Sequence, residues 1–431
     1  MAISKYYLWT VGCQMNQADS EKLAAGFDRM GLRPTDRMER ADIVVLNTCA
    51  VRQHAEDRAY SKLGRIRELK LQKPELKVAV MGCMVGLRTT ELQRRFPQVD
   101  VFARPQQFEP IIELIDGPHE DLGGEFWPST YAIPDGPTAF VPVVHGCNKF
   151  CTYCIVPYRR GREKSRPLDA IVREVAYLSA NGVREVTLLG QTVEAYGHDL
   201  PDQPDISDLM RELSALERLY RIRFLTSYPK DMTHRILEGV ASLPKVMECF
   251  SLPVQAGSDA VLSSMRRGYT RSEYLDKIAE VRALMPHAGI TTDIIVGYPG
   301  ETEADFEETC ELLESLRFDK VHVAAYSPRP GTIAFRTMED DVPAGVKAAR
   351  LHRIEELEAR ISQEINNTYT GTQQEILVEG VRNEQPFGRT RTGKLVHLDA
   401  PARIGTRVDV TIEHAGPFSL RGHAEDTLTL A

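Results

Sequence analysis

The chain has 431 residues, a length that predicts two or three domains rather than one. Apolar residues make up 42% and charged residues 26%, as in a globular protein, and no apolar run approaches the roughly 18 residues of a membrane span. The net charge of −8 excludes a chain-wide basic surface, so any surface for nucleic acid must be local. Eight cysteines with no secretion signal favour a reducing cytoplasm, where cysteines more often serve metals or catalysis than disulfides.

Residues 1–125 alternate strand-like and helix-like segments, which predicts a domain built on a parallel α/β sheet. Three of the strand-like runs end shortly before a cysteine. The runs are Lys5–Val11, Asp42–Leu46 and Lys77–Met81, and the cysteines are Cys13, Cys49 and Cys83. Ligands of parallel sheets gather beyond the carboxyl ends of the strands, so we expect the three thiols to form one metal site. The alternative is three small residues buried at strand ends.

A Gly-, Pro- and acid-rich stretch without periodicity, residues 122–137, reads as a linker. An apolar run, Ala139–Val144, then leads into the loop GCNKFCTYC, which carries Cys147, Cys151 and Cys154. Thiolates favour zinc or iron–sulfur clusters, and three ligands rather than four leave one metal position open for a small molecule. A structural zinc site, with His145 or a distant residue as fourth ligand, is the alternative.

Five further strand-like runs follow in residues 138–340, each separated from the next by a helix-like stretch. The runs are Glu185–Leu189, Arg221–Thr226, Cys249–Val254, Thr292–Val296 and Lys320–Ala325. Six βα units are fewer than the eight that close a full barrel, so we predict a partial (βα)6 barrel with one open side. Its site should lie at the carboxyl ends of the strands. Cys249 and Cys310 fall within a strand and on a helix face, and we expect both to pack in the core.

Two basic segments are candidates for RNA contact. Tyr158–Arg166 has five basic residues and one acid, and is either a phosphate-binding patch or an ordinary solvated surface. Residues 341–370 predict a helical tether, and residues 371–431 a small β-barrel. Within that barrel, Phe387–Lys394 (FGRTRTGK) has three cations, an aromatic and no acid, and either contacts RNA or packs against a neighbouring domain.

The motifs resemble those of one enzyme family. CxxxCxxC after a first strand resembles the signature of radical S-adenosylmethionine (SAM) enzymes. GCQMN at Gly12–Asn16, NTC at Asn47–Cys49 and the Gly82-Cys83 pair resemble the N-terminal domain of methylthiotransferases, and the GCQMN form is most similar to the MiaB family, which acts on tRNA. GRT and SLRG near the C-terminus resemble the tRNA-binding TRAM domain.

The resemblance implies two [4Fe–4S] clusters. Cys147, Cys151 and Cys154 would hold the cluster that binds and cleaves SAM, and Cys13, Cys49 and Cys83 an auxiliary cluster that carries or donates sulfur. Further SAM contacts would come from Tyr153, Gly190, Gln191, Ser227, Gln255 and Gly297. The chain departs from the family pattern with GQTV for GQNV and AGSD for SGSD, neither of which removes a cysteine.

The implied reaction is sulfur insertion and methylation at C2 of N6-isopentenyladenosine, at position 37 of tRNA. Expected partners are the anticodon stem-loop, a sulfur donor and an electron donor such as flavodoxin or ferredoxin, with the protein a cytoplasmic monomer away from membranes. Three alternatives remain: the same chemistry on threonylcarbamoyladenosine tRNA, the same chemistry on a ribosomal protein, or a non-catalytic iron–sulfur electron-transfer protein.

Overall fold

The computed structural model describes residues 3–50, 53–86, 89–117 and 131–424. It contains two compact units. The first unit comprises residues 1–133, 145–148 and 154–164, and the second comprises residues 134–144, 149–153 and 165–431. Most of the expected linker at residues 122–137 lies outside the described residues.

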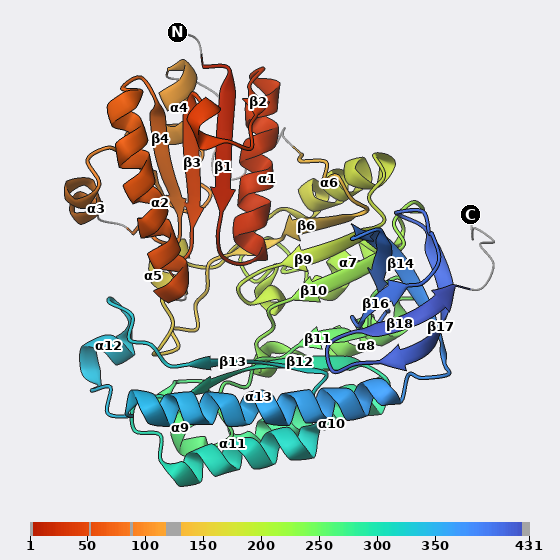
Figure 1. Cartoon of the computed structure of the whole chain (residues 1–431). Coiled ribbons are helices and arrows are strands. Elements are labelled where there is room, and N and C mark those ends of the chain that lie inside the picture. Colours follow the sequence, from red (N-terminus) through yellow and green to blue (C-terminus); the bar gives the residue numbers. More distant parts are fainter. Residues whose placement is uncertain (1–2, 51–52, 87–88, 118–130, 425–431) are drawn as a thin grey trace. The chain divides into compact units, whose positions relative to one another are not determined.

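The first unit is built on a parallel sheet of five strands in the order β2-β1-β3-β4-β5 (Figure 1). The strands are β1 (Lys5–Thr10), β2 (Arg33–Pro34), β3 (Ile43–Thr48), β4 (Lys77–Gly82) and β5 (Val101–Ala103). In this order the chain leaves β1 toward one edge and returns on its other side as β3. A ligand site of an open α/β sheet is expected at such a reversal, beyond the carboxyl ends of β1 and β3.

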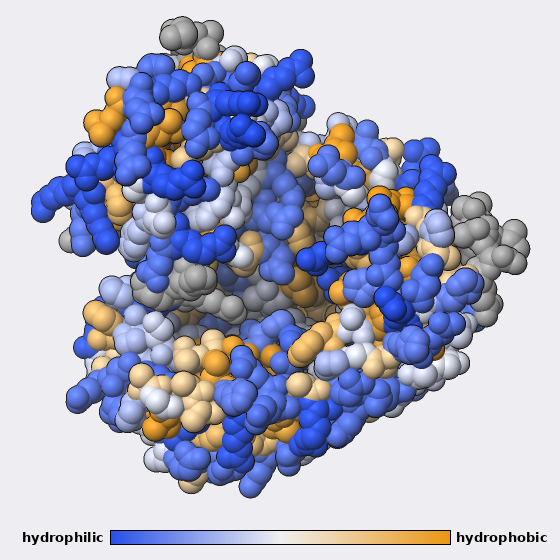
Figure 2. All heavy atoms as spheres, viewed as in Figure 1, coloured by the Kyte–Doolittle hydropathy of each residue, from blue (hydrophilic) through white to orange (hydrophobic). Residues whose placement is uncertain are grey.

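Helices cover both faces of this sheet because its central strand is buried on both sides. Ile43 and Val45 of β3 pack with Leu23 of α1, whereas Val44 and Leu46 face the opposite way, into a core that includes Leu63 of α2. The visible faces of α1 and α2 are mostly hydrophilic (Figure 2). The helical segments of the unit are α1 (Gln14–Arg29), η1 (Met38–Arg40), α2 (Gln53–Gln72), α3 (Thr90–Arg95), α4 (Glu109–Asp116) and α5 (Val156–Arg160).

The second unit contains the predicted partial barrel, as two parallel three-stranded sheets ordered β10-β9-β6 and β11-β12-β13. The strands are β6 (Thr138–Pro142), β9 (Glu185–Leu189), β10 (Arg221–Leu225), β11 (Cys249–Ser251), β12 (Gly289–Val296) and β13 (Lys320–Ala325). A parallel bridge between Ile222 and Val246 links the two sheets. Two short strands flank the cysteine loop, β7 (Val144–His145) and β8 (Lys164–Ser165).

Helices alternate with the barrel strands, and several begin at residues that the sequence marks as caps. Capping boxes at Asp205, Thr270 and Thr302 start three of them, because each side chain accepts from the N3 backbone and the N3 carboxylate accepts in return. The segments are α6 (Leu168–Ala180), η3 (Val193–Ala195), α7 (Ile206–Ser214), η4 (Pro229–Asp231), α8 (His234–Ser242), α9 (Asp259–Ser264), α10 (Arg271–Leu284), α11 (Glu303–Leu316), α12 (Ile333–Thr337) and α13 (Ala344–Asn367). No described helix combines the length and apolar character needed to cross a bilayer.

The C-terminal part of the second unit is a closed five-stranded barrel ordered β14-β15-β16-β18-β17. Its strands are β14 (Gln373–Arg382), β15 (Gln385–Arg389), β16 (Leu395–Leu398), β17 (Arg407–Ala415) and β18 (Leu420–Ala424). The small β-barrel that the sequence predicts here is confirmed. Alternating apolar residues such as Ile376, Val378, Val410 and Ile412 fill its core.

Candidate active site

The first three cysteines follow three neighbouring strands of the first unit. Thr48 of β3 pairs with Gly82 of β4, and the next residue, Cys83, donates its backbone N–H to Thr48 O at 2.8 Å. Cys49 and Cys83 therefore leave adjacent strands side by side. Cys13 caps α1 just after β1, whose neighbour in the sheet is β3. All three lie at the carboxyl edge of the sheet, where the strand order predicts a ligand site.

Glycines make this close approach possible. Gly82 has φ +98°, and a Cβ there would overlap Thr48 O, so only glycine fits without a shift of the backbone. Gly12 has φ +136°, and a Cβ on it would lie 3.1 Å from the Cβ of Cys49. The backbone beside Cys13 thus packs directly against Cys49.

The polar residues of the two motifs hold the strand ends in place. Asn16 donates from Nδ2 to Val11 O at 3.0 Å and to Thr48 O at 2.9 Å, which ties the loop after β1 to the end of β3. Asn47 donates in turn to Asn16 O at 2.7 Å and to Ser20 Oγ at 2.9 Å. The asparagines of GCQMN and NTC therefore fix the cysteine loops.

The three thiols differ in their exposure to solvent. Cys13 is exposed, whereas Cys49 and Cys83 are buried. Burial raises the pKa of Cys83, the charge of Arg160 opposes that shift, and Cys13 is near enough to add to it. Within the described ranges no three His, Cys, Asp or Glu side chains converge as they would on one metal ion.

Arg160, at the end of α5, reaches this same place in the first unit. Its side chain is 2% exposed, and Nη2 donates to Asn16 Oδ1 at 2.7 Å and to Asp19 Oδ2 at 3.3 Å. Arg166, from the same basic segment, is likewise buried, in an ion pair with Glu174. The segment Tyr158–Arg166 is therefore not simply a solvated basic surface, because two of its five cations are committed to internal ion pairs.

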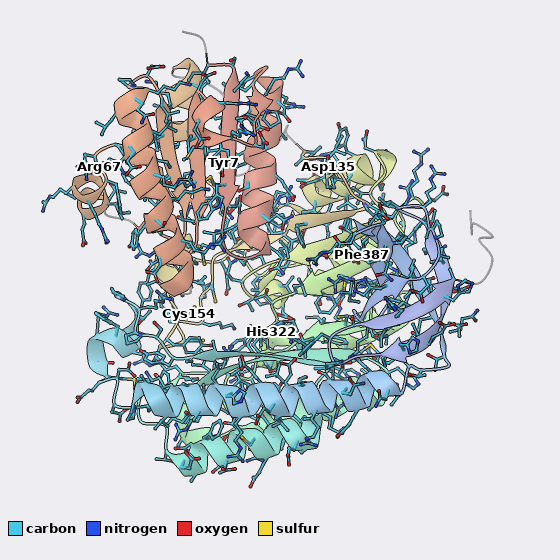
Figure 3. The ribbon with its side chains drawn as sticks, in the orientation of Figure 1. Tyr7, Arg67, Asp135, Cys154, His322 and Phe387 are labelled. Atoms are coloured by element: carbon cyan, nitrogen blue, oxygen red, sulfur yellow. The ribbon has the colours of Figure 1, made fainter. Side chains whose placement is uncertain are left out.

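The second cysteine loop contributes to both units. In the first unit, Cys147 N–H donates to Gly161 O at 3.1 Å, and Asn148 donates to the Glu163 carboxylate from its backbone and side-chain nitrogens, both at 2.9 Å. Cys147 and Cys151 are buried and Cys154 is partly buried. Figure 3 labels Cys154. The backbone on the Cys147 side is thus held by the chain that follows the loop.

In the second unit, the loop is anchored by a buried arginine that sequence reasoning missed. Arg267 is 4% exposed, and its Nη1 lies 3.4 Å from Cys151 Sγ and 3.3 Å from the Tyr153 hydroxyl. Nη2 donates to Pro253 O at 2.7 Å, and the guanidinium lies over the ring of Tyr228. The Arg266-Arg267 pair after α9 carries no sequence signal for this role, because only the tertiary fold brings Arg267 to Cys151.

The predicted SAM contacts lie at the carboxyl ends of the barrel strands. Gly190 and Gln191 directly follow β9. Ser227 follows β10, where its N–H donates to Ser251 O of β11 at 3.1 Å. Gln255, with φ +81°, bridges to Ile294 of β12.

Gly297 follows β12, and its N–H donates to the buried Glu301 at 2.5 Å. These five residues, from Gly190 to Gly297, therefore all lie at the carboxyl ends of parallel strands in the second unit.

A second residue at this edge was missed. Glu194, on η3, is 1% exposed, and its Oε2 accepts from Tyr228 N–H at 3.1 Å. Burial raises its pKa to about 7. A hydrogen bond between its carboxylate and the Ser227 side chain opposes part of this rise. No hydrophobic pattern in the sequence around GQTV predicts that Glu194 is buried, so its burial is evident only from the fold.

The basic segment of the C-terminal barrel packs against the (βα) barrel of the same unit. Arg391 pairs with Glu248 at 3.0 Å, and Lys394, which is 8% exposed, contacts Asp319 at 2.7 Å. Phe387 lies on β15 (Figure 3), in a strand rather than a loop. Of the two alternatives for this segment, these contacts favour domain packing over an RNA-tracking surface.

The (βα) barrel contributes arginines of its own to this junction. Arg221 donates to Arg389 O at 2.7 Å, to Glu375 O at 3.0 Å and to the Glu375 carboxylate at 2.8 Å. Arg223 donates to Thr390 O at 2.8 Å. Buried charge-assisted bonds of this kind fix one barrel on the other.

Comparison with known proteins gives three family matches in chain order. Residues 5–103 match the uncharacterized protein family UPF0004, residues 141–313 the Radical SAM superfamily, and residues 367–424 the TRAM domain. Among solved structures, the radical S-adenosylmethionine methyltransferase TsrM from Kitasatospora setae aligns with TM-score 0.56 and 13% identity over 87% of this chain and 77% of that one. That likeness concerns the fold alone.

Relatives match along nearly the whole chain. A protein of Dehalococcoides mccartyi is 43% identical over 419 residues, 96% of this chain and 97% of that protein. Proteins of Roseiflexus sp. and Dictyoglomus thermophilum are 46% and 44% identical over 97% of this chain and 89% and 98% of their own. All three are named tRNA-2-methylthio-N(6)-dimethylallyladenosine synthase. The chain therefore belongs to the family of tRNA-2-methylthio-N(6)-dimethylallyladenosine synthases, the radical SAM methylthiotransferases that the GCQMN and CxxxCxxC motifs indicated.

Proposed function

We propose that this chain converts N6-isopentenyladenosine at position 37 of tRNA to its 2-methylthio derivative, with SAM as both radical source and methyl donor. The observation that carries the proposal is the match, at 43% identity over 96% of the chain, to a relative named for this product. The strand-end cysteines and the CxxxCxxC loop supply the two sets of soft ligands that sulfur insertion and SAM cleavage need.

Cys147, Cys151 and Cys154 would hold the [4Fe–4S] cluster whose open iron binds SAM. When bound, this cluster supplies the electron that splits a sulfur–carbon bond of SAM and so provides the radical. A radical is needed because the adenine C2–H bond is too weakly acidic for side-chain bases. Tyr153, Gly190, Gln191, Ser227, Gln255 and Gly297 would line the SAM site.

Cys13, Cys49 and Cys83 would hold the second [4Fe–4S] cluster, which supplies the sulfur that a second SAM methylates. Two observations support the fit. The thiols follow three neighbouring strands, and a buried guanidinium beside them offsets the negative charge that three thiolates bring.

RNA recognition would combine the TRAM barrel with exposed cations after the second cysteine loop, Arg162 and Lys164. We further propose a monomer in the cytoplasm, supplied with electrons by flavodoxin or ferredoxin and with sulfur by a separate donor.

The test uses anaerobically reconstituted protein with SAM, dithionite, sulfide and one of three substrates: an isopentenylated anticodon stem-loop, a threonylcarbamoylated one, or ribosomal protein. Mass spectrometry of digested products should find the methylthio group on the isopentenylated RNA only. If deoxyadenosine forms but the isopentenylated RNA stays unmodified, the radical SAM chemistry is supported and the proposed substrate is refuted. Absence of deoxyadenosine would favour a non-catalytic iron–sulfur protein.

A further inference from the structure

Arg160 places an unused hydrogen-bond donor beside the first three cysteines. Nη2 is engaged by Asn16 and Asp19, but Nη1 is buried and has no hydrogen-bond partner among the described residues. A buried N–H on a charged guanidinium that finds no acceptor loses its hydration without replacement, which costs more than for a neutral group. The hydrogen bonds to Asn16, Asp19 and the Cys83 side chain thus leave a buried N–H group on Nη1 of Arg160 available to a further acceptor.

The surroundings of this donor identify the class of acceptor. Asn16 Oδ1, which accepts from Arg160 at 2.7 Å, also lies 3.9 Å from Cys13 Sγ. Arg160 makes a hydrogen bond with the Cys83 side chain and interacts electrostatically with Cys13, and it forms an ion pair with Asp19. The nearest atoms that could bind a cluster are therefore the cysteine sulfur atoms. A cluster held by three thiolates with an added sulfur ligand is anionic.

The position of Arg160 in the chain is equally informative. It follows Cys154 by six residues and closes α5, a short helix whose Gly161 accepts the N–H of Cys147. The segment that leaves one cysteine site thus delivers a cation to the other, and both contacts lie within the first unit.

We propose that Arg160 is a positioning residue of the auxiliary site, whose buried guanidinium donates to the anionic sulfur, hydrosulfide or methanethiolate, carried on the open iron. The inference rests on the proposed auxiliary cluster. A charge-assisted N–H···S bond stabilises the more negative state of an iron–sulfur centre, so Arg160 also holds the reduction potential of that cluster higher than it would otherwise be.

The test uses the full-length chain in a background with Cys147→Ala, Cys151→Ala and Cys154→Ala, so that only the auxiliary site can bind a cluster. Iron and sulfide analysis first establishes that this background binds one [4Fe–4S] cluster. Arg160→Gln, Arg160→Lys and the matched control Arg67→Gln, at an exposed position on α2, are then compared. Titration with sodium hydrosulfide is followed by electron paramagnetic resonance of the reduced cluster, and the midpoint potential is measured on the same samples.

Arg160→Gln is expected to weaken hydrosulfide binding by about tenfold to a hundredfold, the loss of one charge-assisted bond, and to lower the midpoint potential. Arg160→Lys should fall between Arg160→Gln and the parent, and Arg67→Gln should match the parent. Iron retained in Arg160→Lys but lost in Arg160→Gln would also support the role, since charge alone then restores the site.

Unchanged hydrosulfide affinity and potential in iron-loaded Arg160→Gln would overturn the inference while leaving the auxiliary cluster in place. Loss of iron in both Arg160 variants would overturn it in favour of a purely structural role. If the background itself binds no iron, the auxiliary cluster and this inference fail together.

Discussion

Replacement of Glu194 by glutamine should stabilise the protein above pH 7 and have less effect near pH 5. Burial raises the pKa of this carboxyl from 4.5 to about 7, so between these values the unfolded chain releases a proton that the folded chain retains. Folding stability of the parent therefore falls as the pH rises through this window. Because the pKa rises from 4.5 to about 7, ionisation of this buried carboxyl lowers the stability by about 3 kcal/mol at pH 8.

Glutamine removes this penalty and retains an oxygen for the Tyr228 N–H. Urea-induced unfolding of the reduced, cluster-free protein at pH 5 and pH 8 measures the effect. The difference in free energy of unfolding between Glu194→Gln and the parent should grow by roughly 2 to 3 kcal/mol from pH 5 to pH 8. Glu212→Gln, at an exposed position on α7, serves as the control and should show no such growth. An equal difference at both pH values would refute the reasoning.

Two further substitutions test the framework around the sites. Gly82→Ala should lower iron binding by the first three cysteines, because the added Cβ overlaps Thr48 O. Gly64→Ala, on the exposed face of α2, meets open space and should stabilise the chain by about 0.5 to 1 kcal/mol. Iron analysis and thermal unfolding of both variants measure the two effects. Arg221→Met should weaken the junction between the two barrels by about 3 kcal/mol, since it removes the donor to Glu375 Oε1 and to two backbone carbonyls and leaves only Arg407 paired with that carboxylate. Faster amide hydrogen exchange in β14 and β15 would show the weakened junction. Unchanged exchange would contradict the role of Arg221 in holding the two barrels together.

The strand-end cysteines show how far sequence reasoning reaches. Hydrophobic runs followed by Gly-Cys or Thr-Cys predict both the parallel sheet and the edge at which the thiols meet, because strand polarity alone determines that edge. The same logic predicted the partial barrel and placed Ser227 and Gln255 at its carboxyl ends. The shortened β11 and the division into two sheets could not be predicted, since strand length depends on pairing with distant segments.

The charged residues show where that reasoning fails. FGRTRTGK has the composition of an RNA contact, yet Arg391 and Lys394 pair with acids of the (βα) barrel that lie more than seventy residues earlier in the chain. Arg160 and Arg267 likewise look like surface cations in the sequence and are buried beside cysteines in the fold. Charge composition does not say which partner a side chain finds, because the partner is supplied by tertiary structure.

The central claim is that the two three-cysteine sets hold separate clusters with separate tasks. The most direct measurement compares Cys13→Ala with Cys151→Ala, each reconstituted anaerobically and assayed for iron, deoxyadenosine and methylthiolated RNA. Each variant should lose about half of the iron of the parent, since each removes a ligand of one of two [4Fe–4S] clusters. Cys13→Ala should still form deoxyadenosine but no methylthio product, and Cys151→Ala should form neither. Loss of deoxyadenosine in Cys13→Ala, or methylthio product in either variant, would contradict the account.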